Sequence, residues 1–361
     1  MAAVDILKVS FEFSSKLGIR ELPQLGSGNE SNIKGLHVVG DLADAPIIKV
    51  ALNQGYEVAK AIMEELKTPS PPDSDTLDVL VIGAGPAGIG AALALGELGA
   101  HYMVLEKERP FNTIQNFPKA KFIFSEPRSL ENRGNFWFDD AQKEFLVDRW
   151  SEQIDAQGLR IQQPEEVVDV RKEGGVFTIT TKIGDHGLMK AVHPGLTTHT
   201  EEGGSNTYKA QRVILAIGRR GSVRKMKVPG EELDKVAYAL KDPDDHAGRR
   251  VAVFGGGDSA VEAAVSCAEA GAEVTVSYRK DGFHRAKKGN KDKIDALIKA
   301  GTIRFEPNTT AKEITPETVV LNRGDEQIVV PNDDVLIFFG TKLPKPFLDK
   351  IGLRFAGQMD A

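Results

Sequence analysis

Two stretches of this chain of 361 residues share one pattern of apolar and polar positions. In each, a short apolar run leads into a glycine-rich turn, and a helical pattern and a second apolar run follow. The first stretch covers residues 78–106 and the second covers residues 250–280. Short apolar runs bounded by turn residues are typical of buried parallel strands, and apolar residues three or four apart predict a helix. The pattern therefore predicts an α/β fold built from strand–helix–strand units.

The turn of the first stretch reads Gly83-Ala84-Gly85-Pro86-Ala87-Gly88. A glycine at 83 permits a tight turn, one at 85 lets the backbone approach a pyrophosphate, and one at 88 lets the following helix pack closely on the strand. The N-terminus of that helix offers free N–H groups and a positive dipole end to phosphates. The candidates for binding at this turn are Gly83, Gly85, Pro86, Ala87 and Gly88.

The second apolar run of this stretch, residues 102–105, ends in Glu106. A carboxylate about 20 residues past such glycines is where a ribose diol finds its hydrogen-bond acceptor. Lys107 follows it as a neighbouring candidate. Strand, glycines, helix, second strand and terminal acid occur here in order, which favours a dinucleotide site over a tight turn without a ligand.

The second stretch carries the same fingerprint, with alanine in place of the third glycine. The apolar run Arg250–Phe254 precedes it and a helical pattern follows it. We expect this turn to bind a second dinucleotide through its backbone and the first turn of the helix. Its candidate residues are Gly255, Gly257, Asp258, Ser259 and Ala260, with a helix-capping role as the alternative for Asp258.

The next strand of the second stretch ends in Arg279 and carries no acid there. A carboxylate at this position would repel a 2′-phosphate, whereas an arginine binds one with two parallel hydrogen bonds. We therefore expect a dinucleotide with an unmodified ribose at the site that ends in Glu106, and NADPH rather than NADH at the site that ends in Arg279. His284 and Arg285 are secondary candidates for the phosphate.

Composition and charge limit the function further. The net charge of −6 argues against general nucleic-acid binding. No apolar run has the roughly 18 residues of a membrane span. With one cysteine the chain can form no internal disulfide, so we expect a protein of the reducing cytoplasm. The single cysteine, Cys267, allows neither a disulfide within the chain nor a CxxC redox pair, and its small and apolar neighbours predict a packed thiol. Three irregularly spaced histidines (186, 193, 199) do not predict a metal site.

A third motif lies near the start of the chain. Residues 35–41, GLHVVGD, read as a strand that ends in Gly40-Asp41, and we expect a helix to follow with Pro46 in its first turn. This motif resembles the FAD motif of the thioredoxin reductase-like flavoproteins. The resemblance implies that Gly40 and Asp41 bind the flavin ribityl chain. It also implies that the backbone of Pro46, Ile47 and Ile48 faces the isoalloxazine ring, whose reduced form the helix dipole stabilises.

In the flavoproteins of that group the Gly-Asp motif closes the chain, whereas here it opens the chain. The sequence therefore resembles a circularly permuted member, with residues 67–76 as the new linker. Proline, serine and aspartate in this linker suit an exposed joint.

The segment after Glu106 resembles the bacillithiol disulfide reductase-like branch through its TIxxFP-type stretch. The resemblance implies isoalloxazine contacts for Thr113, Ile114, Asn116 and Phe117, and a packed surface loop is the alternative. For residues 136–138, FWF, we expect at least two core aromatic residues. Gly218 resembles the turn at which this family's chain passes from the FAD domain to the nucleotide domain.

The expected architecture is two Rossmann-like domains, with the NADPH domain inserted in the FAD domain. The FAD domain would cover residues 1–222 and be completed by 341–361, and the NADPH domain would cover 223–340. We expect residues 184–206 to form a long hairpin insertion and residues 140–156 to form an amphipathic helix, with Phe145 on its apolar side.

The expected reaction is hydride transfer from NADPH to FAD and then to a disulfide or another small-molecule acceptor. One alternative is electron exchange with a protein carrier such as ferredoxin, and the residues do not separate the two. A non-enzyme alternative is a regulatory module that binds FAD and NADP. The resemblance also makes a homodimer possible.

Overall fold

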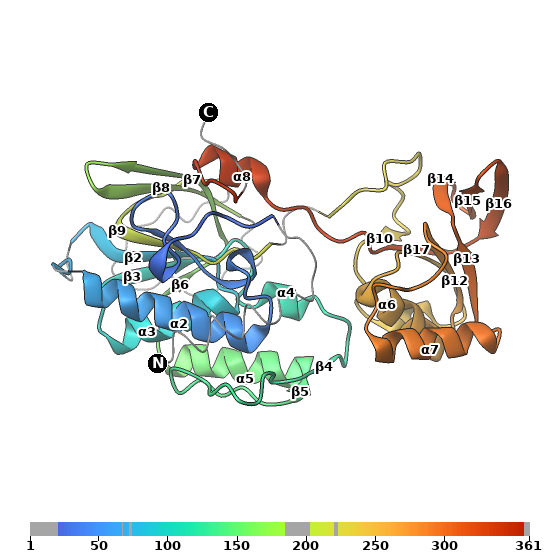
Figure 1. Cartoon of the computed structure of the whole chain (residues 1–361), viewed down its shortest axis with the longest axis horizontal. Coiled ribbons are helices and arrows are strands. Elements are labelled where there is room, and N and C mark those ends of the chain that lie inside the picture. The colour runs from blue at the N-terminus through green and yellow to red at the C-terminus, as the bar shows by residue number, and fades with distance from the viewer. Residues whose placement is uncertain (1–20, 67, 72–73, 185–202, 220–222, 357–361) are drawn as a thin grey trace. The chain divides into compact units, whose positions relative to one another are not determined.

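The computed structural model describes residues 21–66, 68–71, 74–184, 203–219 and 223–356. These residues form two compact units, shown in Figure 1. Unit 1 takes its described residues from Met1–Gln115, Phe122–Arg220 and Leu343–Ala361. Unit 2 takes its described residues from Asn116–Lys121 and Gly221–Lys342.

The centre of unit 1 is a parallel sheet in the order β6-β3-β2-β9-β1. Its strands are β1 (Leu36–Val38), β2 (Thr76–Ile82), β3 (Tyr102–Leu105), β6 (Ile161–Gln162) and β9 (Thr207–Leu215). Strands β2 and β3 have the bounds that the apolar runs predict, within two residues. Because every pairing is parallel, the carboxyl ends of all five strands meet at one edge of the sheet.

An antiparallel layer extends the same sheet. Strand β7 (Glu165–Glu173) pairs with β8 (Val176–Ile183), and β8 pairs with the first half of β9. The second half of β9 pairs with β1, and Val38 lies opposite Leu215. Strands β8 and β9 are antiparallel neighbours, as the expected hairpin requires, whereas most of the expected insertion (185–202) lies outside the described residues.

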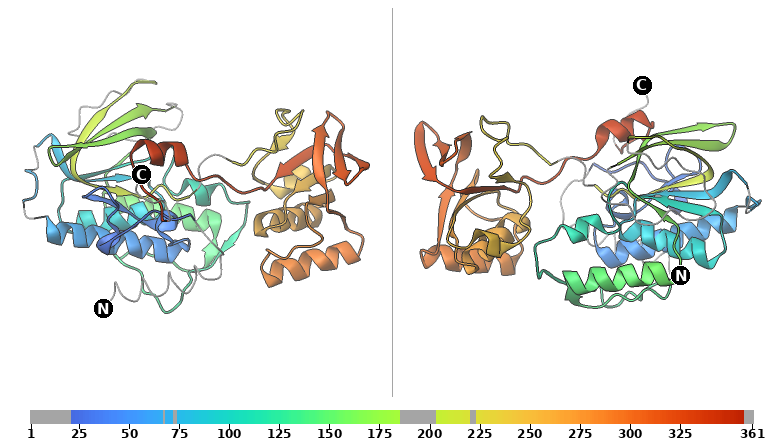
Figure 2. Two further views of the ribbon diagram at one scale, coloured as in Figure 1. Left: turned by 45° about the horizontal axis from the view of Figure 1, so that its top comes forward. Right: turned by 180° about the vertical axis from the view of Figure 1, so that it is seen from behind.

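Two helices lie side by side on one face of this sheet, α2 (Ile48–Glu65) and α3 (Pro86–Glu97), as Figures 1 and 2 show. Their backbones touch, because a Cβ at Gly55 would lie 1.8 Å from the Ala87 carbonyl oxygen and a Cβ at Gly90 would lie 1.9 Å from the Leu52 oxygen. The expected place of Pro46 in the first turn of α2 is wrong: Ile47 is the N-cap, with an extended backbone, and Pro46 precedes it. A helix boundary of this kind depends on local dihedral angles that the apolar pattern does not fix.

An aromatic cluster fixes α5 (Lys143–Ala156) to the segment before it. Trp150 is fully buried and contacts three rings, those of Phe111, Phe136 and Phe138. This confirms two core aromatic residues within 136–138. Phe145, however, is 60% exposed, so its expected place on the apolar side is wrong. It is one position off the four-residue spacing of Leu146, Trp150 and Ile154, all of which are buried.

Unit 2 repeats the parallel pattern in the order β13-β12-β11-β17-β10. Its strands are β10 (Val236–Ala237), β11 (Arg250–Phe254), β12 (Glu273–Tyr278), β13 (Ile303–Pro307) and β17 (Asp334–Ile337). Helices α6 (Asp258–Glu269) and α7 (Lys288–Lys299) belong to this unit, and Cys267 is fully buried in α6, as expected. A separate antiparallel sheet contains β14 (Thr310–Ile314), β15 (Thr318–Arg323) and β16 (Glu326–Pro331).

The end of the described chain returns to unit 1 through α8 (Lys345–Lys350), and Phe355 forms an isolated antiparallel bridge with Pro23. The residues before β1 and those after α8 are therefore neighbours. The remaining elements are α4 (Asn112–Gln115), β4 (Phe122–Ile123), β5 (Ala141–Gln142) and three 3-10 helices, η1 (Ser27–Asn29), η2 (Gly40–Ala43) and η4 (Pro243–His246). In the part of the chain that the structure describes, no helix combines the length and the apolar character that a membrane crossing requires.

Candidate functional site

The first glycine-rich turn forms a cradle between β2 and α3. Gly83 has a φ of +102°, and a Cβ there would lie 2.7 Å from the Ala216 carbonyl oxygen. A Cβ at Gly88 would lie 1.8 Å from the Gly83 oxygen, so only glycine lets α3 begin this close to β2. A Cβ at Gly85 would meet no protein atom within 4 Å. The backbone at 83 and 88 is thus closed by protein, whereas the backbone at 85 faces open space, which fits a pyrophosphate at the N-terminus of α3.

Glu106 closes one side of this cradle. One carboxylate oxygen accepts a hydrogen bond from the Ala84 N–H at 2.7 Å, and the other accepts one from the Glu108 N–H at 2.9 Å. Glu106 is buried, and burial raises the pKa of its carboxyl group, while the two backbone donors oppose the rise. The neighbouring Lys107 is exposed. A buried carboxylate with spare lone pairs beside the cradle fits the hydroxyl groups of a ribose.

The Gly-Asp motif reaches the same cradle from the start of the chain. Gly40 has a φ of +79° and begins η2, and a Cβ there would lie 3.0 Å from the Ala87 Cβ in the first turn of α3. The Gly40 N–H donates to the Gln54 side-chain oxygen at 2.7 Å, which ties η2 to α2. The structure therefore brings Gly40 beside Ala87, although more than 40 residues separate them in sequence.

The other candidates of unit 1 lie at the rim of the cradle. The Phe111 N–H donates to the Ala84 carbonyl oxygen at 2.9 Å, which places the start of α4 beside the turn. Thr113 is exposed on α4, whereas Ile114 is buried in protein. Gly218 has a φ of +62° with open space around its Cα.

The four expected isoalloxazine contacts do not fall in one unit. Thr113 and Ile114 belong to unit 1, whereas Asn116 and Phe117 belong to unit 2. In unit 2 the Lys121 ammonium lies 4.9 Å from the centre of the Phe117 ring and pairs with Glu262 at 2.7 Å. No feature of the sequence indicates that the stretch of residues 113–118 is divided between the two units.

The second glycine-rich turn forms a similar cradle between β11 and α6. Gly255 has a φ of +144°, and a Cβ there would lie 2.8 Å from the Phe338 carbonyl oxygen and 2.9 Å from the Ala260 Cβ. Ala260 is fully buried, as the third position of the fingerprint requires, whereas Ser259 is exposed in the first turn of α6. A Cβ at Gly257 would meet nothing within 4 Å, so this cradle too is open at its middle glycine.

One contact that shapes the second cradle, between Tyr278 and Gly256, was not predicted from the sequence. The Tyr278 ring, at the end of β12, lies so close to Gly256 that a Cβ there would be 2.2 Å from it. The same ring stacks on Phe283, with the centroids 6.2 Å apart. Gly256 is thus required by a side chain from the next strand, which makes Tyr278 a further candidate for this site.

The suggested cap role of Asp258 is wrong. Gly257 is the N-cap of α6, and no side chain caps the helix. Asp258 instead accepts hydrogen bonds from the Lys287 N–H and the Asn290 side-chain amide, both at 2.8 Å. It therefore fastens the loop before α7 to the start of α6.

The last residue of β12 is followed by the cations Arg279 and Lys280, and the first carboxylate after them is Asp281. Arg279, His284 and Arg285 are all exposed. Arg279 has neither a hydrogen bond nor an ion pair among the described residues, whereas His284 pairs with Asp281 at 3.0 Å. An unengaged guanidinium at this strand end fits a phosphate on the ribose, because it has all its donors available.

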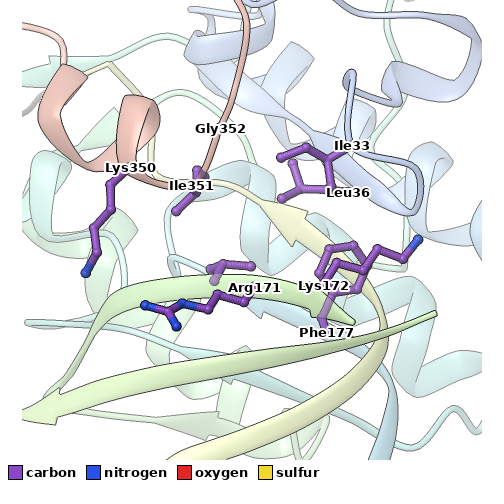
Figure 3. Close-up of a pocket in the computed structure, with 9 residues that line it drawn as sticks. Ile33, Leu36, Arg171, Lys172, Phe177, Lys350, Ile351 and Gly352 are labelled. Atoms are coloured by element: carbon purple, nitrogen blue, oxygen red, sulfur yellow. The ribbon is translucent and has the colours of Figure 1, made fainter. Parts of the chain in front are cut away.

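Unit 1 also has a cavity of about 350 Å³ that lies away from the candidate residues, between the start of β1, the β7–β8 hairpin and the end of α8 (Figure 3). Leu36 and Phe177 lie at its base. Its cations already have partners: Arg171 pairs with Asp169 at 2.9 Å, and Lys350 donates to the Val168 carbonyl oxygen at 2.8 Å. No group of three or more potential metal ligands exists among the described residues, and the three histidines at 186, 193 and 199 lie outside them.

The comparisons with known proteins agree with this geometry. The family model described as pyridine nucleotide-disulphide oxidoreductase matches residues 77–360, from the start of β2 onward. Among curated relatives, a ferredoxin–NADP reductase of Ignicoccus hospitalis is 29% identical over 289 residues, which cover 78% of this chain and 83% of the relative. The bacilliredoxin reductase Bdr of Bacillus subtilis is 29% identical over 276 residues, covering 76% and 80%.

Solved structures give the same picture. The bacillithiol disulfide reductase Bdr of Bacillus cereus superposes with a TM-score of 0.67 at 30% identity, covering 77% of this chain and 82% of that one. Thioredoxin reductase of Lactococcus lactis shares the fold, with a TM-score of 0.59 at 22% identity. These findings confirm the expected fold and the expected cofactors, FAD and NADPH, and they favour an enzyme over a regulatory module. The chain belongs to the pyridine nucleotide-disulphide oxidoreductase family, as an FAD-dependent NAD(P)H oxidoreductase with thioredoxin reductase-like architecture.

Proposed function

We propose that unit 1 binds FAD, that unit 2 binds NADPH, and that electrons leave the flavin directly to an acceptor outside the chain. The observation that carries this assignment is the contrast between the two strand ends. The Glu106 side chain at the end of β3 is a buried carboxyl group, whereas the Arg279 side chain after β12 is an exposed guanidinium group with a positive charge. Only the second accommodates a 2′-phosphate.

The proposed FAD site uses three segments of unit 1. The cradle at Gly83, Gly85 and Gly88 would hold the pyrophosphate, Glu106 the adenosine ribose, and Gly40-Asp41 the ribityl chain. When bound, the flavin accepts a hydride from NADPH and then gives up two electrons. The residues of the chain position the two cofactors, and no acid or base of the protein is required for the hydride transfer. We place the FAD domain at 1–222 and 341–361 and the NADPH domain at 223–340.

We also propose that the chain is a circular permutation of its family. Three observations support the proposal. The family match begins at residue 77, the Gly-Asp strand β1 pairs with β9 in the same sheet as β2, and Pro23 is bridged to Phe355 near the far end of the chain. A join between the two ends would restore an order in which the Gly-Asp motif comes last.

We propose that this chain uses no thiol relay of its own, because its one cysteine is buried in α6. Burial raises the pKa of the Cys267 thiol to about 12, which keeps it protonated and unreactive. The acceptor must therefore meet the flavin itself. A buried, unpaired thiol also agrees with a reducing compartment such as the cytoplasm. A homodimer stays a prediction from the resemblance.

The first candidate acceptor is a low-molecular-weight disulfide. It is supported by the similarity to bacillithiol disulfide reductase, whose name states such a substrate. The second candidate is a ferredoxin-type carrier, supported by the relatives that are named ferredoxin–NADP reductases. Both readings share the same NADPH half-reaction.

An anaerobic experiment separates these steps. The purified protein is reconstituted with FAD and mixed with NADPH or with NADH, and the flavin absorbance near 450 nm is followed. We expect fast bleaching with NADPH, at about 1–100 s⁻¹, and slow bleaching with NADH. Reduced protein is then offered a bacillithiol-type disulfide and a ferredoxin in separate runs, and the one that restores absorbance within the turnover time is the acceptor. A protein that binds no FAD would refute the proposal.

A further inference from the structure

The two glycine-rich turns meet their neighbouring strands in the same register, so their residues can be matched one by one. In unit 1 the N–H of Gly83 donates to the carbonyl oxygen of Leu105 at 2.8 Å. In unit 2 the N–H of Gly255 donates to the carbonyl oxygen of Ser277 at 3.2 Å. Each bond joins the first glycine of a turn to the neighbouring strand of a parallel pair. Leu105 and Ser277 are therefore equivalent, and so are the residues that follow them.

The residue that follows contacts its turn in both units. In unit 1 it is Glu106, whose carboxylate accepts a hydrogen bond from the Ala84 N–H at 2.7 Å. In unit 2 it is Tyr278, which lies against Gly256. A Cβ on Gly256 would be 2.2 Å from Cε1 of the Tyr278 ring and 2.3 Å from Cζ, the carbon that carries the hydroxyl group. Tyr278, rather than Arg279, therefore stands in the position that Glu106 has in unit 1.

Contacts within unit 2 fix the Tyr278 side chain. Its ring is parallel to that of Phe283 within 6°, with the centroids 6.2 Å apart, and Phe283 is fully buried against Phe305. The Thr309 N–H donates to the Tyr278 carbonyl oxygen at 3.1 Å, which fixes the backbone as well. The Tyr278 side chain is half-buried, and its hydroxyl group makes no hydrogen bond with any described residue. The phenol is thus held at the turn with its hydroxyl group available to a ligand.

A carboxylate and a phenol at this position favour different riboses. A carboxylate accepts hydrogen bonds from ribose hydroxyl groups and repels a phosphate on one of them. A phenol brings no negative charge, and its hydroxyl group can donate to a phosphate oxygen. The ring also needs the space that Gly256 leaves, whereas the Glu106 carboxylate is compatible with the Ala84 methyl group. The pair Gly256 and Tyr278 therefore replaces the pair Ala84 and Glu106 as one unit.

We infer that Tyr278 is a specificity-determining residue of the dinucleotide site in unit 2. It takes the position of the acid, so that no carboxylate faces the ribose there, and its hydroxyl group donates to the 2′-phosphate of NADPH. The next residue, Arg279, supplies the positive charge, whereas Tyr278 supplies a neutral donor and removes the acceptor of an unmodified ribose. The inference rests on the proposed function, which places NADPH in unit 2.

The test measures the binding of two probes, 2′-phospho-ADP-ribose and ADP-ribose, which lack the nicotinamide ring and cannot reduce the flavin. Calorimetric titration of the FAD-reconstituted protein gives a dissociation constant for each probe. We expect Tyr278→Glu to bind the phosphorylated probe at least about 30-fold more weakly, because a carboxylate a few ångströms from a phosphate repels it. ADP-ribose should bind at least as tightly as it does to the wild type, because its ribose gains an acceptor. Tyr278→Phe should bind only the phosphorylated probe more weakly, by about tenfold, because one hydrogen bond to a charged group is lost.

The control for the added charge is Thr302→Glu. Thr302 is exposed at the amino end of β13, whereas the turn lies at the carboxyl ends of these parallel strands. We expect Thr302→Glu to bind both probes within about twofold of the wild type, because salt screens a charge at the far edge of the sheet.

A second experiment tests the matched pair. Gly256→Ala should weaken the binding of both probes more than about tenfold, because the methyl group displaces the Tyr278 ring. When Gly256→Ala is combined with Tyr278→Glu, the pair equals that of unit 1, and ADP-ribose should bind within about threefold of its affinity for Tyr278→Glu alone. Gly289→Ala, at a glycine of α7 with open space around it, is the control for the added methyl group.

The deciding quantity is the ratio of the two dissociation constants. A ratio in Tyr278→Glu or in Tyr278→Phe within about twofold of the wild-type ratio would refute the inference, because the ring would then be a structural element only. If Tyr278→Glu does not fold, the ratio in Tyr278→Phe decides alone. A wild type that binds neither probe, or binds ADP-ribose as tightly as the phosphorylated probe, would contradict the proposed function instead.

Discussion

The Glu106 carboxylate accepts a hydrogen bond from the Ala84 N–H at 2.7 Å, which joins the end of β3 to the glycine-rich turn 22 residues earlier. The acid and the turn are therefore one rigid site. A ligand that spans them, with a phosphate at one end and a ribose at the other, meets groups that are already in place.

The protonation of Glu106 leads to a pH-dependent affinity for FAD. Burial raises the pKa of the Glu106 carboxyl above its usual 4.5, so the empty folded protein holds this proton more tightly than the unfolded chain does. The stability that this proton contributes is present below pH 4.5 and is lost as pH rises through the raised pKa. Ribose hydroxyl groups donate to the ionised carboxylate, so binding of FAD favours loss of the proton.

We therefore expect the affinity for FAD to rise with pH above 4.5 and to level off once Glu106 is ionised. Glu106→Gln should bind FAD about 10–100-fold more weakly, because hydrogen bonds to a charged acceptor are lost, and its affinity should not change over pH 5–8. The measurement is a flavin absorbance titration at each pH. Glu108→Gln, which changes a half-exposed neighbour, is the control. An equal pH dependence in Glu106→Gln would show that another group titrates.

Two glycines of the same turn should respond to alanine in opposite ways. A Cβ at Gly88 would lie 1.8 Å from the Gly83 carbonyl oxygen, whereas a Cβ at Gly85 has open space. We expect Gly88→Ala to lose about 3 kcal/mol or more of unfolding free energy, since α3 must move away from β2. Gly85→Ala should keep the stability of the empty protein within about 0.5 kcal/mol. Its FAD affinity should fall more than about tenfold, because the methyl group takes the space of the pyrophosphate.

Thermal unfolding without FAD and absorbance titration with FAD measure the two effects separately. A loss of stability in Gly85→Ala equal to that in Gly88→Ala would contradict the assignment of open space to a ligand.

The features that could be predicted from the sequence are those that depend on residues close together in the chain. Strand β11 has the predicted bounds because an apolar run next to a glycine turn has few alternatives. The roles of Gly83, Gly85 and Gly88 follow from the steric limits of one turn, and the open or closed space at each position agrees with them.

The parts that the sequence did not predict depend on the arrangement of distant segments. Gly256 is required by the ring of Tyr278, which comes from the next strand, and Asp258 binds the loop before α7 instead of its own helix. Whether Lys49 is buried or exposed is not visible in a helical pattern, because a lysine in the first turn of a helix is usually solvated. Each of these depends on a partner that no local periodicity identifies.

Cys267 should be dispensable for turnover. It is fully buried in α6, and burial raises the pKa of its thiol to about 12. We expect Cys267→Ala to oxidise NADPH within about twofold of the wild-type rate and to lose about 1–2 kcal/mol of unfolding free energy from the smaller side chain. Iodoacetamide should label the wild type only after unfolding, since the thiolate is the reactive form. Loss of acceptor reduction with intact flavin reduction would instead identify Cys267 as a relay.

Arg279 should discriminate between the two nicotinamide cofactors. It is exposed after β12 and has no hydrogen bond or ion pair within the described chain, so its guanidinium group is available to a 2′-phosphate. We expect Arg279→Gln to raise the KM for NADPH about 10–100-fold, which corresponds to one lost charge-assisted pair, and to leave the KM for NADH unchanged. The flavin reduction rate at saturating NADPH should stay close to the wild-type value, because the hydride transfer itself is untouched.

The control for this prediction is Arg285→Gln, which removes an exposed cation from the loop that follows. We expect a smaller effect from it, one that higher salt removes, because a charge without a bidentate contact acts only through the screened field. The effect of Arg279→Gln should persist in salt. Equal losses with NADPH and NADH would mean that Arg279 contacts a part that both cofactors share, and the preference for NADPH would then have to come from Arg285 or His284.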